Sequence, residues 1–175
     1  MLTHGKSLQQ KRILGVDPGL QKTGWGMIEY TGSSLHFIAC GTIKSKTSDP
    51  LATRLYHLAS ELAQIIKEYT PNSAAIEETF VNNNGASTLK LGQARGALLL
   101  TLAQHDLPVG EYAARMVKKA IVGVGQAEKT QVAHMVKILL PHARNALDSS
   151  GADALDALAI ALTHAQLQSY AGKVA

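Results

Sequence analysis

The 175-residue chain has little of several features that mark particular classes of protein. Its one cysteine, Cys40, allows neither an internal disulfide nor a zinc site built from several cysteines. Its longest apolar run, residues 97–103, is far short of the ~20 residues that a membrane-spanning helix needs. The polar start of the chain has no apolar segment typical of a secretory signal. These absences predict a cytoplasmic protein with no membrane partner.

Common nucleotide and zinc motifs are also missing. Residues 19–24 have Walker-like glycine spacing, but Trp25 stands where a phosphate loop requires lysine. The seven histidines form no H-E-x-x-H motif, and aromatic residues, at 5%, are too few for a broad base-stacking surface. Lysine and arginine number 17 against 13 acidic residues, a net charge of +4. This excess favours a polyanionic partner.

Hydrophobic patterning predicts strands and helices in a definite order. Three short strands with tight connections come first, as in an antiparallel meander, and two more alternate with helices. The strands are predicted at residues 12–17, 24–30, 35–43, 73–77 and 108–112, and the helices at 50–70, 86–105, 114–121, 126–140 and 152–168. Asp49 is the expected N-cap of the first helix, with Pro50 at its first position.

This order predicts an α/β fold of the ribonuclease-H-like type, a five-stranded mixed sheet flanked by helices. No low-complexity linker divides the chain, so we expect a single domain. The expected boundaries are a loose N-terminal extension at 1–11, the domain at 12–170 and a short tail at 171–175.

Four acidic residues stand in unusual surroundings. Asp17 and Glu77 each end an apolar strand, where sites in α/β proteins are often found. Asp153 and Asp156 lie in an alanine- and leucine-rich helix and, three residues apart, share a face. Simpler explanations exist for parts of this set. The helix pair alone could compensate a helix dipole, and Asp17 before Pro-Gly could be a turn former.

Together, the four acids predict a site for divalent cations. No arginine or lysine is evident between them, and grouped carboxylates cost several kcal/mol per ion without a neutralising charge. Oxygen-only ligands suit Mg²⁺ or Mn²⁺, and two such ions ~3.5–4 Å apart can promote phosphodiester hydrolysis. In this hypothesis Asp17 bridges the ions, and Glu77 with Asp153 or Asp156 completes their shells, so that a metal-bound water attacks in line.

Motifs along the chain resemble those of one family. They are ILGVDPG at 13–19, AIE at 75–77, LKLGQARG at 89–96, EYAAR at 111–115, VKK at 117–119, AEKTQV at 127–132 and ADALDALA at 152–159. In this order they resemble the bacterial RuvC Holliday-junction resolvases, over nearly the whole predicted domain. The resemblance implies a crossover junction endodeoxyribonuclease with a ribonuclease-H-like fold, acting as a homodimer in recombination and repair. It also implies paired symmetric nicks in four-way DNA junctions, with two Mg²⁺ per active site, replaceable by Mn²⁺. RuvA and RuvB are the implied protein partners.

The resemblance also assigns residues. The catalytic and metal-binding acids would be Asp17, Glu77, Asp153 and Asp156. The residues expected to bind DNA are Phe80, Lys90, Arg95, Arg115, Lys118, Lys119 and Lys129. Lysines beside the acids can neutralise phosphates, and Phe80 can stack on an unpaired base or anchor its loop. Arg95 could instead pack its stem across its helix. Gly92 and Gly96 share a helix face and predict close packing, within the chain or across a dimer interface.

Two other functions stay open. Asp17-Pro18-Gly19-Leu20 resembles the first phosphate loop of sugar kinases and actin-like ATPases, although those enzymes need two lobes. A junction-binding relative without catalytic activity is the second. Nicked product from a junction in Mg²⁺, or ATP turnover without DNA, would distinguish these alternatives.

Overall fold

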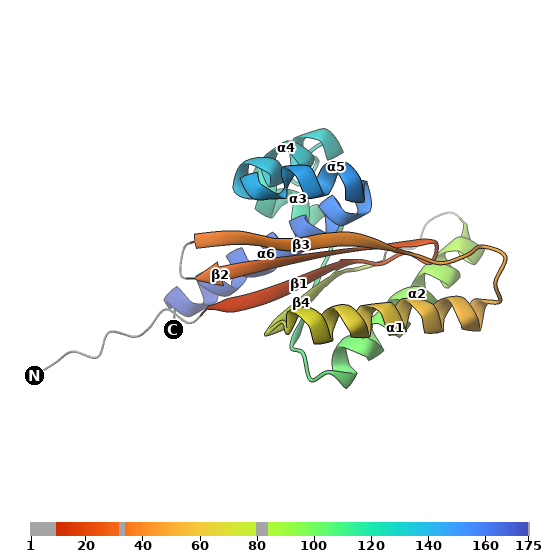
Figure 1. The fold of residues 1–175 in the computed structure, drawn as a ribbon. Coiled ribbons are helices and arrows are strands. Elements are labelled where there is room, and N and C mark those ends of the chain that lie inside the picture. The colour runs from red at the N-terminus through yellow and green to blue at the C-terminus, as the bar shows by residue number, and fades with distance from the viewer. Residues whose placement is uncertain (1–9, 32–33, 80–83, 175) are drawn as a thin grey trace, which may run out of the picture.

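A mixed five-stranded sheet forms the centre of the fold (Figure 1). The structure, a computed structural model, describes residues 10–31, 34–79 and 84–174. The strand order is β3-β2-β1-β4-β5. The strands are β1 (Lys11–Asp17), β2 (Lys22–Thr31), β3 (Ser34–Lys44), β4 (Ser73–Glu77) and β5 (Val109–Tyr112). The first three form the predicted antiparallel meander, and β4 and β5 continue the sheet parallel to β1. The carboxyl ends of β1, β4 and β5 therefore meet at one edge.

Helices cover both faces of the sheet. On one face lie α1 (Leu51–Tyr69) and α2 (Gly85–Gln104). The other face carries α3 (Ala114–Val122), α4 (Lys129–Leu139), a 3-10 turn at Pro141–Ala143, α5 (Arg144–Ser150) and α6 (Ala152–Val174). Alternation along β1 sends Ile13 into the core beneath α6 and Leu14 into the core beneath α1 and α2. The predicted α/β architecture is confirmed.

Some predicted boundaries were wrong. Pro50 is the N-cap of α1 and has extended backbone (φ −54°, ψ 148°), so Asp49 lies one residue too early to cap the helix. The helix predicted from residue 126 begins at Lys129, because Glu128 and Gln131 form a reciprocal capping box there. The short helix α5 was not predicted.

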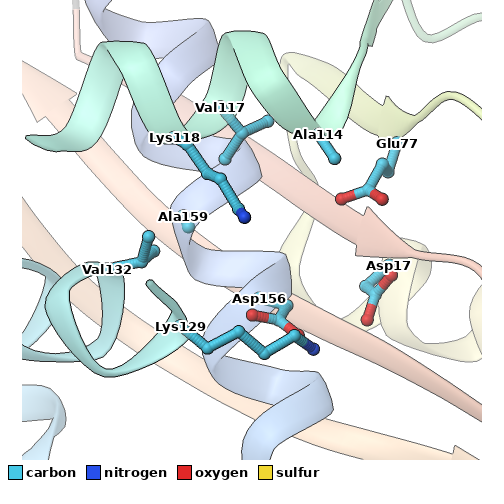
Figure 2. Close-up of a pocket in the computed structure, with 9 residues that line it drawn as sticks. All are labelled: Asp17, Glu77, Ala114, Val117, Lys118, Lys129, Val132, Asp156 and Ala159. Carbon is cyan, nitrogen blue, oxygen red and sulfur yellow. The ribbon is translucent and has the colours of Figure 1, made fainter. Parts of the chain in front are cut away.

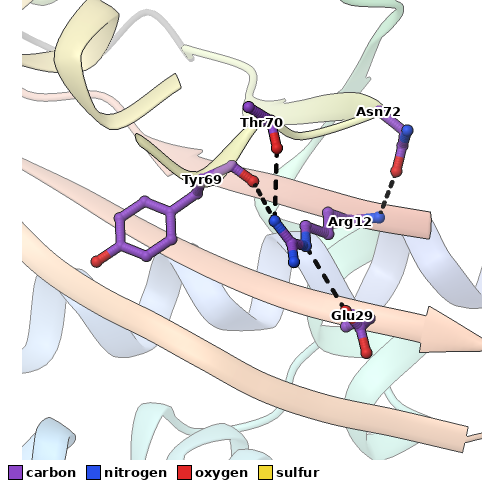
Figure 3. A network of polar contacts seen from close by, with 5 residues as sticks. All are labelled: Arg12, Glu29, Tyr69, Thr70 and Asn72. Carbon is purple, nitrogen blue, oxygen red and sulfur yellow. Dashed lines mark hydrogen bonds and ion pairs between the residues drawn. The ribbon is translucent and has the colours of Figure 1, made fainter. Parts of the chain in front are cut away.

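Arg12 ties the start of β1 to the end of α1 (Figure 3). Its guanidinium Nη1 donates to the carbonyl of Tyr69 at 3.0 Å and to the hydroxyl of Thr70 at 3.4 Å. Its Nε lies 3.6 Å from the carboxylate of Glu29 on β2, and its backbone N–H donates to the side chain of Asn72 at 2.7 Å. This network lies at the opposite end of β1 from Asp17.

None of the helices in the described ranges has the length and apolar character of a membrane span. The cytoplasmic location and the domain boundaries of the sequence analysis stay predictions. Of the expected N-terminal extension, residues 1–9 lie outside the described residues.

Candidate active site

The ends of β1 and β4 bring two of the predicted acids together. The parallel register pairs Val16 with Ile76, so Asp17 and Glu77 follow at neighbouring positions. Side chains alternate along a strand, so both acids point to the face that carries α6, as Figure 2 shows. The apolar runs that end in these acids thus place their carboxyl groups at one edge of the sheet.

Helix α6 supplies the other two acids, and glycines allow it to lie directly on the sheet. A Cβ built at Gly15 of β1 would overlap the backbone of Ala157, and one at Gly24 of β2 would overlap the carbonyl of Asp153. At Gly26 it would press on the side chain of Leu158. Glycine inside a strand often marks such a close approach, and sequence analysis missed this signal.

Three of the four acids line one pocket of about 160 Å³ (Figure 2). The pocket is lined by Asp17, Glu77, Asp156, Lys118, Lys129, Ala114, Val117, Val132 and Ala159. Asp153 is not part of the lining, but its charge acts on Asp17. The structure therefore brings together acids from distant parts of the chain, from Asp17 to Asp156.

The carboxylates in this pocket oppose one another electrostatically. Burial is the main cause that raises the pKa of Asp17 to about 7, followed by repulsion from Glu77, Asp156 and Asp153. Burial and then Asp156 also raise the pKa of Glu77. A positive charge between these groups would relieve both effects.

The prediction that no lysine lies between the acids was wrong. The Nζ of Lys129 stands 3.4 Å from Oδ2 of Asp156, and Lys118 points into the pocket from α3. Lys129 lies on α4 and Asp156 on α6, 27 positions further along the chain, so the sequence alone did not predict their contact. Lys129 pairs with one acid only and its side chain is 82% exposed, so the pKa of Asp17 remains raised despite it.

The donor set suits a hard divalent cation. The acids that gather here offer carboxylate oxygens without histidine or cysteine, which fits Mg²⁺ or Mn²⁺. Across the described ranges, no three Asp, Glu, His or Cys side chains already stand in the arrangement of an assembled metal site.

The residues predicted to bind DNA fall into different surroundings. Lys118 and Lys129 line the acid pocket, whereas Arg115 and Lys119 line a separate groove of about 620 Å³ beside α3. Lys90 is exposed on α2. Phe80 lies outside the described residues.

Arg95 is bound by protein partners. Its Nε donates to the backbone carbonyl of Glu77 at 2.9 Å, and its Nη2 pairs with the carboxylate of Glu111. Its side chain is only 17% exposed. Glu111 was not among the predicted site residues, and nothing local to that residue indicated its pairing with Arg95.

One face of α2 is open. A Cβ at Gly92 or Gly96 would have nothing within 4 Å, so neither glycine serves packing among the described residues of this chain. Leu89 and Leu100 lie on the same side of the helix and are 64% and 60% exposed. The prediction of close packing within the chain is therefore wrong for the described residues, and packing across a dimer interface stays a prediction.

Comparison with known proteins is consistent with this geometry. The family model for crossover junction endodeoxyribonuclease RuvC matches residues 13–164. The RuvC of Xanthobacter autotrophicus is 58% identical over 154 residues, covering 88% of this chain and 89% of that protein.

Solved structures give the same picture. Thermus thermophilus RuvC, in complex with Holliday junction substrate, matches with a TM-score of 0.83 at 29% identity, covering 92% of this chain and 96% of that one. The yeast mitochondrial Holliday junction resolvase shares the fold at 14% identity, with a TM-score of 0.66 and coverage of 92% and 81%. These matches confirm the predicted ribonuclease-H-like fold.

Proposed function

Because this chain belongs to the RuvC family of crossover junction endodeoxyribonucleases, we propose that it resolves four-way DNA junctions by paired symmetric nicks during recombination and repair. The observation that carries the proposal is the gathering of Asp17, Glu77 and Asp156 in one pocket, with Asp153 beside it. The Thermus relative, whose structure holds a Holliday junction, supports the same substrate for this chain.

The acids would hold two divalent ions, Mg²⁺ or in its place Mn²⁺. Asp17, whose charge is opposed by Glu77 and by Asp156, would be one of the residues that hold them. Glu77 and Asp153 or Asp156 would complete the two sets of ligands. When bound, the ions supply an activated water and stabilise the leaving oxygen of the phosphodiester.

Basic residues would hold the DNA backbone beside these acids. Lys118 and Lys129 face the pocket, so they can meet the phosphate at the cut, while Arg115 and Lys119 extend the positive surface along α3. Such contacts give affinity and orientation, with little sequence information. Lys90 and Phe80 stay predicted DNA contacts, and RuvA and RuvB stay predicted partners on the strength of the resemblance alone.

Cleavage assays with the full chain test this function. With Mg²⁺, we expect two symmetric, ligatable nicks in a synthetic four-way junction and none in a duplex or single strand of the same sequence. With EDTA, the junction should be bound and left uncut. Junction binding without nicks in Mg²⁺ would favour the non-catalytic relative, and ATP turnover without DNA would favour the ATPase.

The open face of α2 would form the homodimer interface. A two-fold pair places two active sites against two related strands, as paired nicking requires. The exposed side chains of Leu89 and Leu100, with the bare backbone at Gly92 and Gly96 between them, allow two copies of the helix to approach closely.

A charge on this face is expected to separate the dimer. Leu100→Lys would bury an unpaired ammonium at the interface, so light scattering should report a monomer, and coincident nicking of both strands should be lost. Ile138→Lys on α4 is the matched control, since Ile138 is similarly exposed at 50% and lies on another helix. A Leu100→Lys protein that stays dimeric would rule out this interface.

A further inference from the structure

Arg95 contacts the end of β4 from the side of the sheet that carries α2. It lies on α2, between Ala94, which is buried in the core beneath α1 and α2, and the open face of that helix. The carboxylate of Glu77 lies on the opposite side of the sheet, in the acid pocket. Arg95 nevertheless reaches Glu77, because its Nε donates to the backbone carbonyl of that residue at 2.9 Å.

The same guanidinium also holds the neighbouring strand. Its Nη2 pairs with Glu111 of β5, and β4 and β5 are joined at this point by the bond from the N–H of Glu78 to the carbonyl of Tyr112 at 2.9 Å. Arginine presents its donors in a rigid planar fork, so two contacts fix both position and direction. Glu77 is the last residue of β4, and Arg95 adds a side-chain restraint to its backbone beside the bond that Glu78 makes to β5.

We propose that Arg95 is a positioning residue that fixes the backbone of Glu77, and so directs its carboxylate into the metal-binding pocket. The inference rests on the proposed function, and it replaces the predicted contact between Arg95 and DNA. A phosphate contact would need a guanidinium free to meet DNA, whereas that of Arg95 is engaged by a carboxylate and a carbonyl and its side chain is 17% exposed.

Arg95 acts through the backbone and not through its charge. The cations that lower the pKa of Glu77 are Lys129 and Lys118, which face its carboxylate in the pocket. The charge of Arg95 is balanced by Glu111 on the other strand. Loss of Arg95 should therefore misplace Glu77 without directly changing the charge around it. Loss of groups that orient metal ligands typically costs ~10–100-fold in metal affinity or activity.

The test compares Arg95→Gln with a matched arginine elsewhere. Arg12 makes the same two kinds of contact at the far end of β1, where it donates to the carbonyl of Tyr69 and pairs with Glu29. Arg12→Gln thus removes the same kind of contact away from the acids. Arg95→Lys keeps the positive charge but lacks the planar guanidinium that makes both contacts. Each full-length protein is measured for Mn²⁺ affinity without DNA, for the cleavage rate at saturating protein and for junction affinity in EDTA.

Arg95→Gln is expected to lower both Mn²⁺ affinity and the cleavage rate by ~10–100-fold, with junction affinity in EDTA unchanged. Arg95→Lys should fall between Arg95→Gln and the wild type. Arg12→Gln should lower thermal stability and leave Mn²⁺ affinity and cleavage rate as in the wild type.

Two results would overturn the inference. One is weaker junction binding by Arg95→Gln in EDTA, with a smaller salt dependence and an unchanged rate at saturation, because that pattern identifies a phosphate contact. The other is an equal loss of cleavage rate in Arg12→Gln and Arg95→Gln, which would indicate general destabilisation. Failure of the wild type to cut junctions would count against the proposed function instead, and Mn²⁺ affinity would still decide the role of Arg95.

Discussion

Asp17→Asn is expected to abolish junction cleavage, to leave junction binding in EDTA intact, and to stabilise the metal-free protein at neutral pH. Asparagine nearly preserves the shape of the side chain but removes the charge that would hold the ions. The same charge is unfavourable without metal, because the site is buried and shared with Glu77, Asp156 and Asp153. Full cleavage activity in this variant would refute the assignment of Asp17.

The pH dependence of stability gives a second readout of the same substitution. Asp17 has a pKa of about 7 in the folded protein, whereas an unfolded aspartate titrates near ~3.9. Between these values the folded state keeps a proton that the unfolded state has lost. The free energy of unfolding should therefore fall as pH rises from about 4 to about 7, by at most ~4 kcal/mol from this group.

Thermal unfolding in EDTA across this pH range measures the effect. The wild type should lose stability towards pH 7 more steeply than Asp17→Asn, and addition of Mn²⁺ at pH 8 should stabilise the wild type far more than the variant. Asp148→Asn is the control, since Asp148 is 74% exposed on α5 and lies outside the acid pocket. Parallel profiles for wild type and Asp17→Asn would show that neither burial nor the neighbouring carboxylates raise the pKa of Asp17 in the folded protein.

Gly24→Ala is expected to reduce cleavage by ~100-fold or more, although no functional group is changed. The added Cβ would overlap the carbonyl of Asp153, so α6 must move away from β2. Asp153 and Asp156 move with it, and their distance to Asp17 and Glu77 increases. Overpacking of this kind also costs ~1–3 kcal/mol in the free energy of unfolding.

Single-turnover cleavage and thermal unfolding distinguish displacement from simple instability. Gly15→Ala presses on α6 near Ala157, further along the helix, and should show the same two losses. Gly85→Ala on α2 is the matched control, because its Cβ would meet no described residue within 4 Å. Wild-type cleavage by a folded Gly24→Ala protein would contradict the proposed seating of α6.

Local sequence determined the strands, the long helices and the identity of the acids. The apolar runs that end in Asp17 and Glu77 predict where these strands end. The end of a strand can be predicted locally, because side-chain alternation and turn residues depend on only a few neighbouring positions. The resemblance to RuvC could then join these acids into one expected site. The start of α4 was missed by three residues because its capping box at Glu128 and Gln131 outweighed the apolar pattern before it.

Only the tertiary structure decided what surrounds the acids. The ion pair of Lys129 with Asp156 and the bond from Arg95 to Glu77 join residues 27 and 18 positions apart. Neither contact can be predicted from helix or strand periodicity. Each depends on how closely two elements pack and on the direction in which their side chains point. Glycines at 15 and 24 set that distance for α6, and the fork of Arg95 reaches the strand end because α2 packs beneath it. The residue types thus predicted the chemistry of this site. Its geometry was set by packing between segments that are distant in the chain.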